Sequence, residues 1–163
     1  MKKYILILMV FALLFPCCKK GSADKSEKVT SFEIFSDPAK VGEETAISVR
    51  ITNNTGFLTL AVTIEYDSDV MSLSRIENGK DFTDYNFIPA KDMKSGCTTC
   101  WFTDNLQNRR SDGELLKLYF SIADNAKIGK YPIAVLPIND GSVVDENKSP
   151  IAVDGCRAYI TIK

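Results

Sequence analysis

Apolar and polar residues alternate along several short stretches of the chain, most clearly over residues 58–67. Apolar side chains at positions 60, 62, 64 and 66 alternate there with small or polar ones. A period of two is that of a β-strand with one buried and one solvent-facing side. Asp67-Ser68-Asp69 then breaks the alternation, because such side chains hydrogen-bond to their own backbone. The pattern predicts a half-buried strand that ends at Tyr66-Asp67.

The same alternation recurs after residue 31 and predicts further strands. They are expected over residues 32–34, 47–51, 99–103, 116–122, 131–138, 151–153 and 158–162. Turn signals such as Asn53-Asn54-Thr55-Gly56 separate them, and no convincing helical period occurs after the N-terminal segment. Many short strands with frequent turns favour an all-β fold, an antiparallel β-sandwich. Residues 77–96 are polar and irregular and are expected to form a long connection, and Pro132 and Pro137 place residues 131–138 near an edge or a bulge.

The N-terminal segment has a different pattern. Met1-Lys2-Lys3 precedes an apolar run over residues 4–15, which is shorter than the ~20 residues that cross a bilayer. This is typical of a secretion signal. Cysteine directly after the run resembles the lipobox of a bacterial lipoprotein; an ordinary cleaved signal is the other interpretation. Cys18 is the better candidate for lipidation and Cys17 the alternative, because Pro16 precedes Cys17.

These patterns divide the chain into three parts. Residues 1–18 are expected to be a lipoprotein signal peptide, residues 19–30 a flexible tether, and residues 31–163 one folded domain. Acyl chains on the N-terminus hold a protein on a membrane without spanning it. We therefore expect a lipid-anchored, extracytoplasmic protein of the bacterial cell envelope.

Composition and charge narrow the chemistry. The 163 residues carry a net charge of −1 with 25% charged side chains, so nucleic acid is not an expected partner. The chain has no histidine, which removes Ser-His-Asp and Cys-His nucleophiles and the usual neutral-pH general base. Paired carboxylates remain as a catalytic option without a motif to support them. We expect no enzyme activity and no cofactor; Asp140, Asp145 and Asn147 are expected to form a solvated turn rather than a calcium loop.

The cysteines predict a disulfide. Cys97-Thr98-Thr99-Cys100 has the spacing of a redox or metal motif but lacks a second pair, any histidine and a following helix. In an exported protein a structural disulfide between Cys97 and Cys100 is favoured. Either of them paired with Cys156 is the alternative, and one thiol is left free.

Several motifs together resemble the cohesin module of bacterial cellulosome-type systems. They are AVTIEYDSDVMSL, FTDN, SDGELLKLYFSIADNAKIGKYPIAV and DGSVVDENKSPIAVDGCRAYITI, and in order and spacing they cover residues 32–162. The resemblance implies a jelly roll of about nine strands whose flat sheet binds dockerin. Dockerin is a small calcium-loaded helical domain carried by polysaccharide-degrading enzymes, so any calcium belongs to the partner.

The resemblance also implies a partner-binding face. The polar contacts that the family makes from the strand ending in Tyr-Asp, an Asn and an Asp, fall at Thr59 and Ala61 and are absent here, whereas Trp101 and Asp104 keep the character of other family contacts. The expected face comprises Thr59, Ala61, Thr63, Trp101, Asp104, Lys117 and Tyr119.

Trp101 decides between two interpretations of this face. By alternation it points away from Cys100 and Phe102 and toward solvent, unless residues 77–96 cover it. An exposed Trp101 would anchor a protein partner or stack on a sugar. A carbohydrate-binding β-sandwich that uses exposed aromatic residues is therefore the alternative function, with polysaccharide as the partner.

Overall fold

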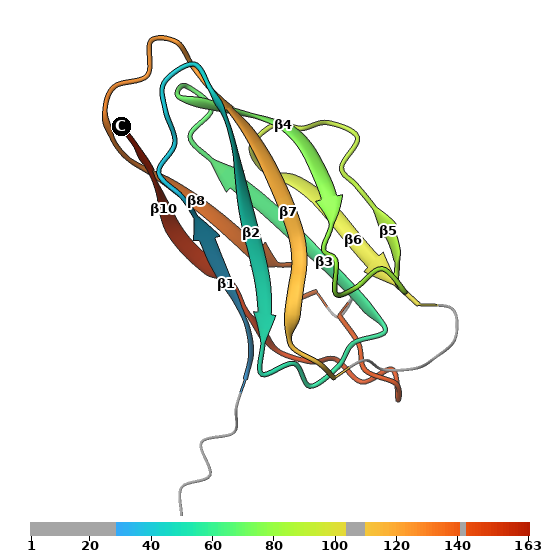
Figure 1. The fold of residues 1–163 in the computed structure, drawn as a ribbon. Coiled ribbons are helices and arrows are strands. Elements are labelled where there is room, and N and C mark those ends of the chain that lie inside the picture. The colour runs from blue at the N-terminus through green and yellow to red at the C-terminus, as the bar shows by residue number, and fades with distance from the viewer. Residues whose placement is uncertain (1–28, 104–109, 141–142) are drawn as a thin grey trace, which may run out of the picture.

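The computed structural model describes residues 29–103, 110–140 and 143–163, and every regular element in these ranges is a β-strand (Figure 1). The strands are β1 (Thr30–Ser36), β2 (Glu44–Thr52), β3 (Thr59–Tyr66), β4 (Met71–Asn78), β5 (Asn86–Ile88), β6 (Cys97–Phe102), β7 (Gly113–Ile122), β8 (Gly129–Pro137), β9 (Val153–Asp154) and β10 (Cys156–Ile162). No helix in this part of the chain is long and apolar enough to cross a membrane.

The strands form two five-stranded sheets packed face to face (Figure 1). The first sheet has the order β4-β7-β2-β1-β9 and the second the order β10-β8-β3-β6-β5. All neighbouring strands are antiparallel except β1 and β9, which pair in parallel. The predicted antiparallel sandwich is confirmed, with ten strands where about nine were expected.

The core lies between the sheets and follows from the period-two pattern. Inward side chains of β2 and β3, such as Ile47, Val49, Val62 and Ile64, are completely buried. Burial of one such side chain contributes about 1.5–3 kcal/mol relative to its exposure. The outward residues between them remain accessible, so each sheet has an outer face available for other contacts.

Strand β8 lies inside the second sheet, between β3 and the edge strand β10, so it is near an edge, as expected, but does not form the edge itself. Its prolines are accommodated at the ends of its pairing with β3. Pro132 lies one residue outside that pairing and Pro137 is its last position. A proline at the end of a ladder removes fewer inter-strand hydrogen bonds than one in the middle, so the alternating pattern outweighs the prolines.

Two short strands and one backbone contact lie at the edges of the two sheets. β9 and β5 are two and three residues long and form one edge of each sheet. β5 lies within residues 77–96, which were expected to be irregular. At the other end of the second sheet, Ala39 donates its backbone N–H to Thr161 at 2.8 Å and accepts from Lys163 at 2.9 Å, which joins the β1–β2 connection to β10.

Candidate functional site

The outward residues of β3 lie where the alternation predicted them. Thr59, Ala61 and Thr63 are half-buried on the outside of the second sheet. The residues between them, Leu60 and Val62, point into the core. Strand β3 has β8 on one side and β6 on the other, so its outward side chains occupy the middle of this sheet.

Trp101 points into the core, so the prediction of an exposed tryptophan was wrong. Its side chain is 1% exposed, and it lies opposite the inward Leu60 in the β3–β6 pairing. The indole Nε1–H donates to Asn78 Oδ1 at 2.8 Å, which satisfies the polar atom of the ring. Phe87 of β5 packs against the indole with ring centroids 5.2 Å apart. Residues 77–96 thus supply the cover that the alternative interpretation required.

Because Trp101 points inward, the alternate residues of β6 face outward. Thr98, Cys100 and Phe102 lie directly opposite Thr63, Ala61 and Thr59. Strand β5 extends these rows, with Ile88 opposite Cys100 and Asn86 opposite Phe102, and Leu136 of β8 lies opposite Thr63.

We call this surface the neutral face. It consists of Thr59, Ala61, Thr63, Asn86, Ile88, Thr98, Cys100, Phe102 and Leu136. None of these side chains carries a formal charge, and Ile88 is 50% exposed at its edge. Four adjacent strands therefore present small, hydroxyl-bearing and apolar groups to solvent.

Lys117 and Tyr119 lie on the other side of the molecule, on the outside of the first sheet, so the structure does not bring them together with Thr59 and Ala61. There they belong to a charged face, which consists of Glu44, Arg50, Arg75, Glu77, Glu114, Lys117 and Tyr119. The Arg75 guanidinium lies 3.9 Å from the centroid of the Tyr119 ring, and the Tyr119 hydroxyl donates to Glu77 at 2.9 Å. Arg75, Glu77 and Glu114 of this face are thus each engaged by a neighbouring side chain, Glu114 by the Ser48 hydroxyl at 2.7 Å.

The remaining predicted site residues fall outside the part of the chain that the structure describes. Asp104 and the two candidate lipidation residues, Cys17 and Cys18, belong to this group. Their roles stay predictions.

Cys97, Cys100 and Cys156 are free thiols, so the predicted disulfide was wrong. Cys97 packs against the core, whereas Cys100 faces outward. Residues three apart in a strand have Cα atoms about 10 Å apart, and a disulfide joins Cα atoms about 4.4–6.8 Å apart. Cys156 is three strands away from β6, which is about 14 Å. Burial raises the pKa of the Cys97 thiol, which keeps it protonated and unreactive at neutral pH.

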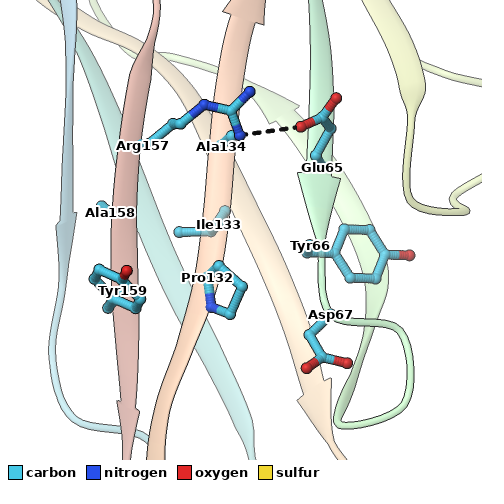
Figure 2. A pocket seen from close by; sticks show the side chains of 9 residues that line it. All are labelled: Glu65, Tyr66, Asp67, Pro132, Ile133, Ala134, Arg157, Ala158 and Tyr159. Carbon is cyan, nitrogen blue, oxygen red and sulfur yellow. Dashed lines mark hydrogen bonds and ion pairs between the residues drawn. The ribbon is translucent and has the colours of Figure 1, made fainter.

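A shallow groove crosses β10, β8 and the end of β3 on the same outer side (Figure 2). Its volume is about 460 Å³. Two rows of outward side chains build it, Tyr159–Pro132–Asp67 and Arg157–Ala134–Glu65. The middle strand contributes only small side chains, which form the floor, while longer side chains from β10 and β3 form the walls. The Arg157 Nη1 atom donates to Glu65 Oε2 at 3.4 Å across Ala134.

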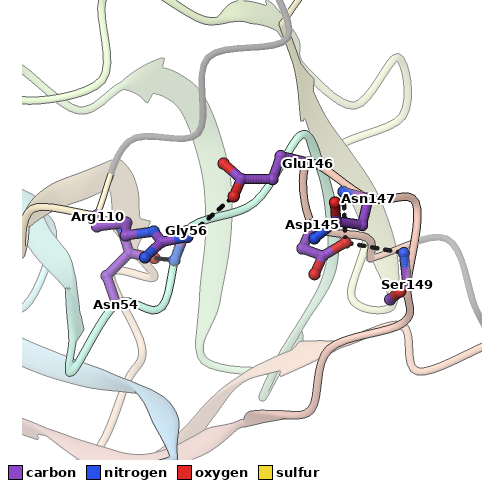
Figure 3. A network of polar contacts seen from close by, with 7 residues as sticks. All are labelled: Asn54, Gly56, Arg110, Asp145, Glu146, Asn147 and Ser149. Carbon is purple, nitrogen blue, oxygen red and sulfur yellow. Dashed lines mark hydrogen bonds and ion pairs between the residues drawn. The ribbon is translucent and has the colours of Figure 1, made fainter.

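The loop over residues 143–150 forms the polar turn that was expected (Figure 3). One oxygen of Asp145 accepts from the backbone N–H groups of Asn147 and Ser149, both at 2.8 Å. The Ser149 hydrogen bond is the main cause that holds the pKa of Asp145 below its usual range. This stabilising contribution is present above the ordinary pKa and is lost as the pH falls through the lowered one. Arg110 pairs with Glu146 at 3.1 Å.

In the described ranges, no group of three or more cysteine, histidine or carboxylate side chains lies close enough together to hold a metal ion. The Asp145 carboxylate is engaged by backbone donors instead.

The strand order and the packing of the two sheets define the class of protein as an all-β jelly-roll module. The sequence profile of the cohesin domain matches residues 30–155, and the chain belongs to the cohesin family. No curated protein sequence matches the chain.

Solved cohesin structures share this fold. The solution structure of CaCohA2 from Clostridium acetobutylicum has a TM-score of 0.65 and 22% identity, covering 84% of this chain and 92% of that one. The cohesin OlpA of Clostridium thermocellum, solved in a type I cohesin–dockerin complex with Doc918, has a TM-score of 0.64 and 16% identity, covering 82% and 99%. The cohesin module of a family 33 glycoside hydrolase from Clostridium perfringens has a TM-score of 0.64 and 12% identity, covering 83% and 97%.

Proposed function

We propose that this chain is a non-catalytic cohesin module that binds a dockerin-type protein through the neutral face. Membership of the cohesin family supports a role in protein interaction. Several structurally similar cohesins were solved in complex with dockerins, including OlpA from Clostridium thermocellum. The calcium of such a complex belongs to the dockerin, so this chain needs no metal of its own.

The observation that carries the proposal is that the neutral face, which spans parts of four adjacent strands, contains no charged side chain; the next outward residue of β3 is the charged Glu65. Transfer of an ion from water into an interface costs several kcal/mol unless a partner compensates it. A face of alanine, threonine, phenylalanine and isoleucine side chains avoids that cost. Its flat centre, around Ala61 and Cys100, can receive a partner closely because both side chains are small.

The partner must differ from dockerins that bind polar side chains on the strand equivalent to β3. Thr59 and Ala61 stand where the resemblance implies an Asn and an Asp, so a partner that requires those groups would leave its own donors unpaired. The proposed partner presents small apolar and hydroxyl-bearing side chains to the neutral face. Its binding depends weakly on ionic strength, since the face offers no charge to screen.

We also propose that the module is held outside the cytoplasm on the cell envelope by a lipid on Cys18, in a polysaccharide-degrading or cell-surface assembly. The N-terminal pattern supports this, with the polar residues between Cys18 and β1 as a tether. Labelled palmitate should enter the wild-type protein and not the Cys18→Ser variant. Equal labelling of both would indicate that the lipid is attached to Cys17, and no labelling of either would refute the proposed lipid anchor.

The decisive experiment compares one substitution on each outer face. Ala61→Arg places a charge in the middle of the neutral face, and Ala46→Arg places the same charge at an outward position of β2 in the first sheet. Dockerin-bearing proteins of the same organism are captured in calcium with the wild-type protein, and their affinities are measured by calorimetry.

Ala61→Arg is expected to weaken binding about 100-fold, since a charge would be buried without a partner, and Ala46→Arg is expected to leave it unchanged. Capture of no dockerin-bearing protein by the wild type, or equal loss from both variants, would overturn the proposal. Thermal unfolding of both variants excludes a folding defect as the cause.

The alternative of sugar stacking on Trp101 is not retained, because the indole is buried. The exposed aromatic ring of the second sheet is Tyr159, which lies in the groove away from the neutral face.

A further inference from the structure

The groove across β10, β8 and β3 has the shape of an open binding site. Pro132 and Ala134 form its floor, and Tyr159 rises from β10 with 66% of its side chain exposed (Figure 2). The Arg157–Glu65 ion pair closes the groove at the level of Ala134. The level of Pro132 stays open, between the Tyr159 ring and the Asp67 carboxylate.

Tyr159 is the most exposed aromatic residue in the described part of the chain. On the outside of the first sheet, Tyr119 is engaged by Arg75 and Glu77, and Phe35 is 48% exposed. The Tyr159 ring has only Pro132 directly opposite it in the β8–β10 pairing. A flat ring beside a proline offers an apolar platform at one wall of the groove.

The side chains of the groove walls determine which hydrogen-bonding groups and charges a ligand can have. Asp67 Oδ1 accepts from the Asp69 backbone N–H at 3.1 Å, which leaves acceptor capacity on the second oxygen. Glu65 adds a further carboxylate and Arg157 a group of N–H donors. Two carboxylates against one guanidinium give the groove a slight excess of negative charge, which disfavours phosphates, nucleic acids and acidic glycans.

We propose that this groove binds a pyranose ring of an uncharged glycan chain. A sugar ring has an apolar C–H face that stacks on an aromatic side chain, and hydroxyl groups around its rim that both donate and accept hydrogen bonds. Tyr159 receives the C–H face, Asp67 accepts from hydroxyl groups, and Arg157 donates to them. The groove is open at the surface, so it accommodates a residue within a polymer as well as a chain end.

This site is separate from the neutral face, although both lie on the outer side of the second sheet. The groove uses β10, the first half of β8 and the end of β3, whereas the neutral face uses Leu136 of β8, the first part of β3, and β6 and β5. The inference does not depend on dockerin binding. The two sites adjoin along the sheet, since Glu65 and Ala134 of the groove are the next outward residues after Thr63 and Leu136 of the neutral face.

Native affinity electrophoresis of the full-length protein in detergent tests the proposal. The gels contain hydroxyethylcellulose, galactomannan or arabinoxylan as neutral probes, and polygalacturonate as the anionic probe. The wild-type protein is expected to be retarded by at least one neutral polysaccharide and not by polygalacturonate. Tyr159→Ala should weaken that binding about tenfold or more, because it removes the stacking platform, whereas Tyr159→Phe keeps the ring and should keep most of the affinity.

Two further variants make the result specific. Phe35→Ala removes an aromatic ring that is 48% exposed on the first sheet and should leave retardation unchanged. Ala61→Arg should also leave it unchanged, which separates failure of this site from failure of the protein-binding face. Tyr159→Ala is expected to unfold at the wild-type temperature, because the ring is exposed.

The proposal is overturned if no neutral polysaccharide retards the wild type, if only polygalacturonate does, or if Tyr159→Ala binds as tightly as the wild type. Equal loss in Tyr159→Ala and Phe35→Ala would likewise overturn it, since that pattern indicates non-specific stacking.

Discussion

The two outer faces of this sandwich are each formed by a five-stranded sheet, and their side chains differ in chemistry. On the charged face, Arg75 covers the Tyr119 ring and Tyr119 donates to Glu77, so polar groups satisfy one another. On the neutral face, threonine, alanine, phenylalanine and isoleucine side chains carry no charge. A partner on the charged face would have to displace these internal contacts. A partner on the neutral face displaces water from apolar and hydroxyl groups only.

The difference indicates that the charged face favours solubility, whereas the neutral face favours partner binding. Partnered surface charges keep a protein in solution and add little to stability. Removal of apolar surface from water contributes about 25 cal/mol per Å², without a geometric requirement on the partner's charges. The neutral face therefore favours binding by shape and hydrophobic contact, and the charged face disfavours it.

The largest expected effect tests which side of β6 forms the neutral face. Trp101→Ala should lower the free energy of unfolding by about 3–5 kcal/mol, since a completely buried indole leaves a cavity. Trp101→Phe fills most of that space but leaves Asn78 Oδ1 without its donor, which should cost about 1–2 kcal/mol. Urea denaturation measures both. A loss in Trp101→Ala below that of an exposed-site variant such as Phe35→Ala would mean that the indole lies on the surface.

An intermediate effect compares two apolar side chains of equal exposure. Ile88 is 50% exposed beside the neutral face and Phe35 is 48% exposed on the first sheet. Ile88→Asp should weaken binding of the captured partner about tenfold, because it introduces an unpaired carboxylate at the rim of the contact. Phe35→Asp should change the affinity less than about twofold, as expected of a residue outside an interface. Equal effects in calorimetry would remove the distinction between the faces.

The smallest effect concerns the charged face alone. Arg75→Ala removes the cation–π contact with Tyr119 and the 3.1 Å ion pair with Glu77. Because these groups are partly exposed, the free energy of unfolding should fall by only about 0.5–1 kcal/mol. Partner affinity should not change. A loss of affinity without a loss of stability would show that the charged face takes part in binding.

Strand β3 could be predicted in full because each of its faces has one character. Its inward positions, Leu60, Val62, Ile64 and Tyr66, all carry apolar side chains, and its outward positions are small or polar. Strand β6 has bulky apolar side chains at two adjacent positions, Trp101 and Phe102, so alternation alone does not say which is buried. The choice depends on a long-range contact: Asn78 of β4 accepts the indole N–H inside the core. No local pattern encodes that contact.

The sheet to which a strand belongs was also beyond the local pattern. Lys117 and Tyr119 were correctly placed on the outward side of a strand, but β7 pairs with β2 and β4 in the first sheet. Alternation reports burial on one side of a strand and is the same in either sheet. The family resemblance supplied the fold and the importance of β3, while assembly of the face required the register between β3, β6 and β5.

The edges of the two sheets, two of which are the short strands β5 and β9, affect whether copies of this module aggregate at high concentration. A long, flat edge exposes unpaired N–H and C=O groups and can add a strand from a neighbouring molecule, which starts aggregation. β5 and β9 offer only three and two residues for such pairing, and a register irregularity between Leu73 and Arg75 interrupts the edge formed by β4. At the fourth edge, Ala39 covers one end of β10 through its hydrogen bonds with Thr161 and Lys163. Each sheet edge is therefore short, interrupted or partly covered, which disfavours the growth of a continuous sheet between neighbouring copies at high concentration.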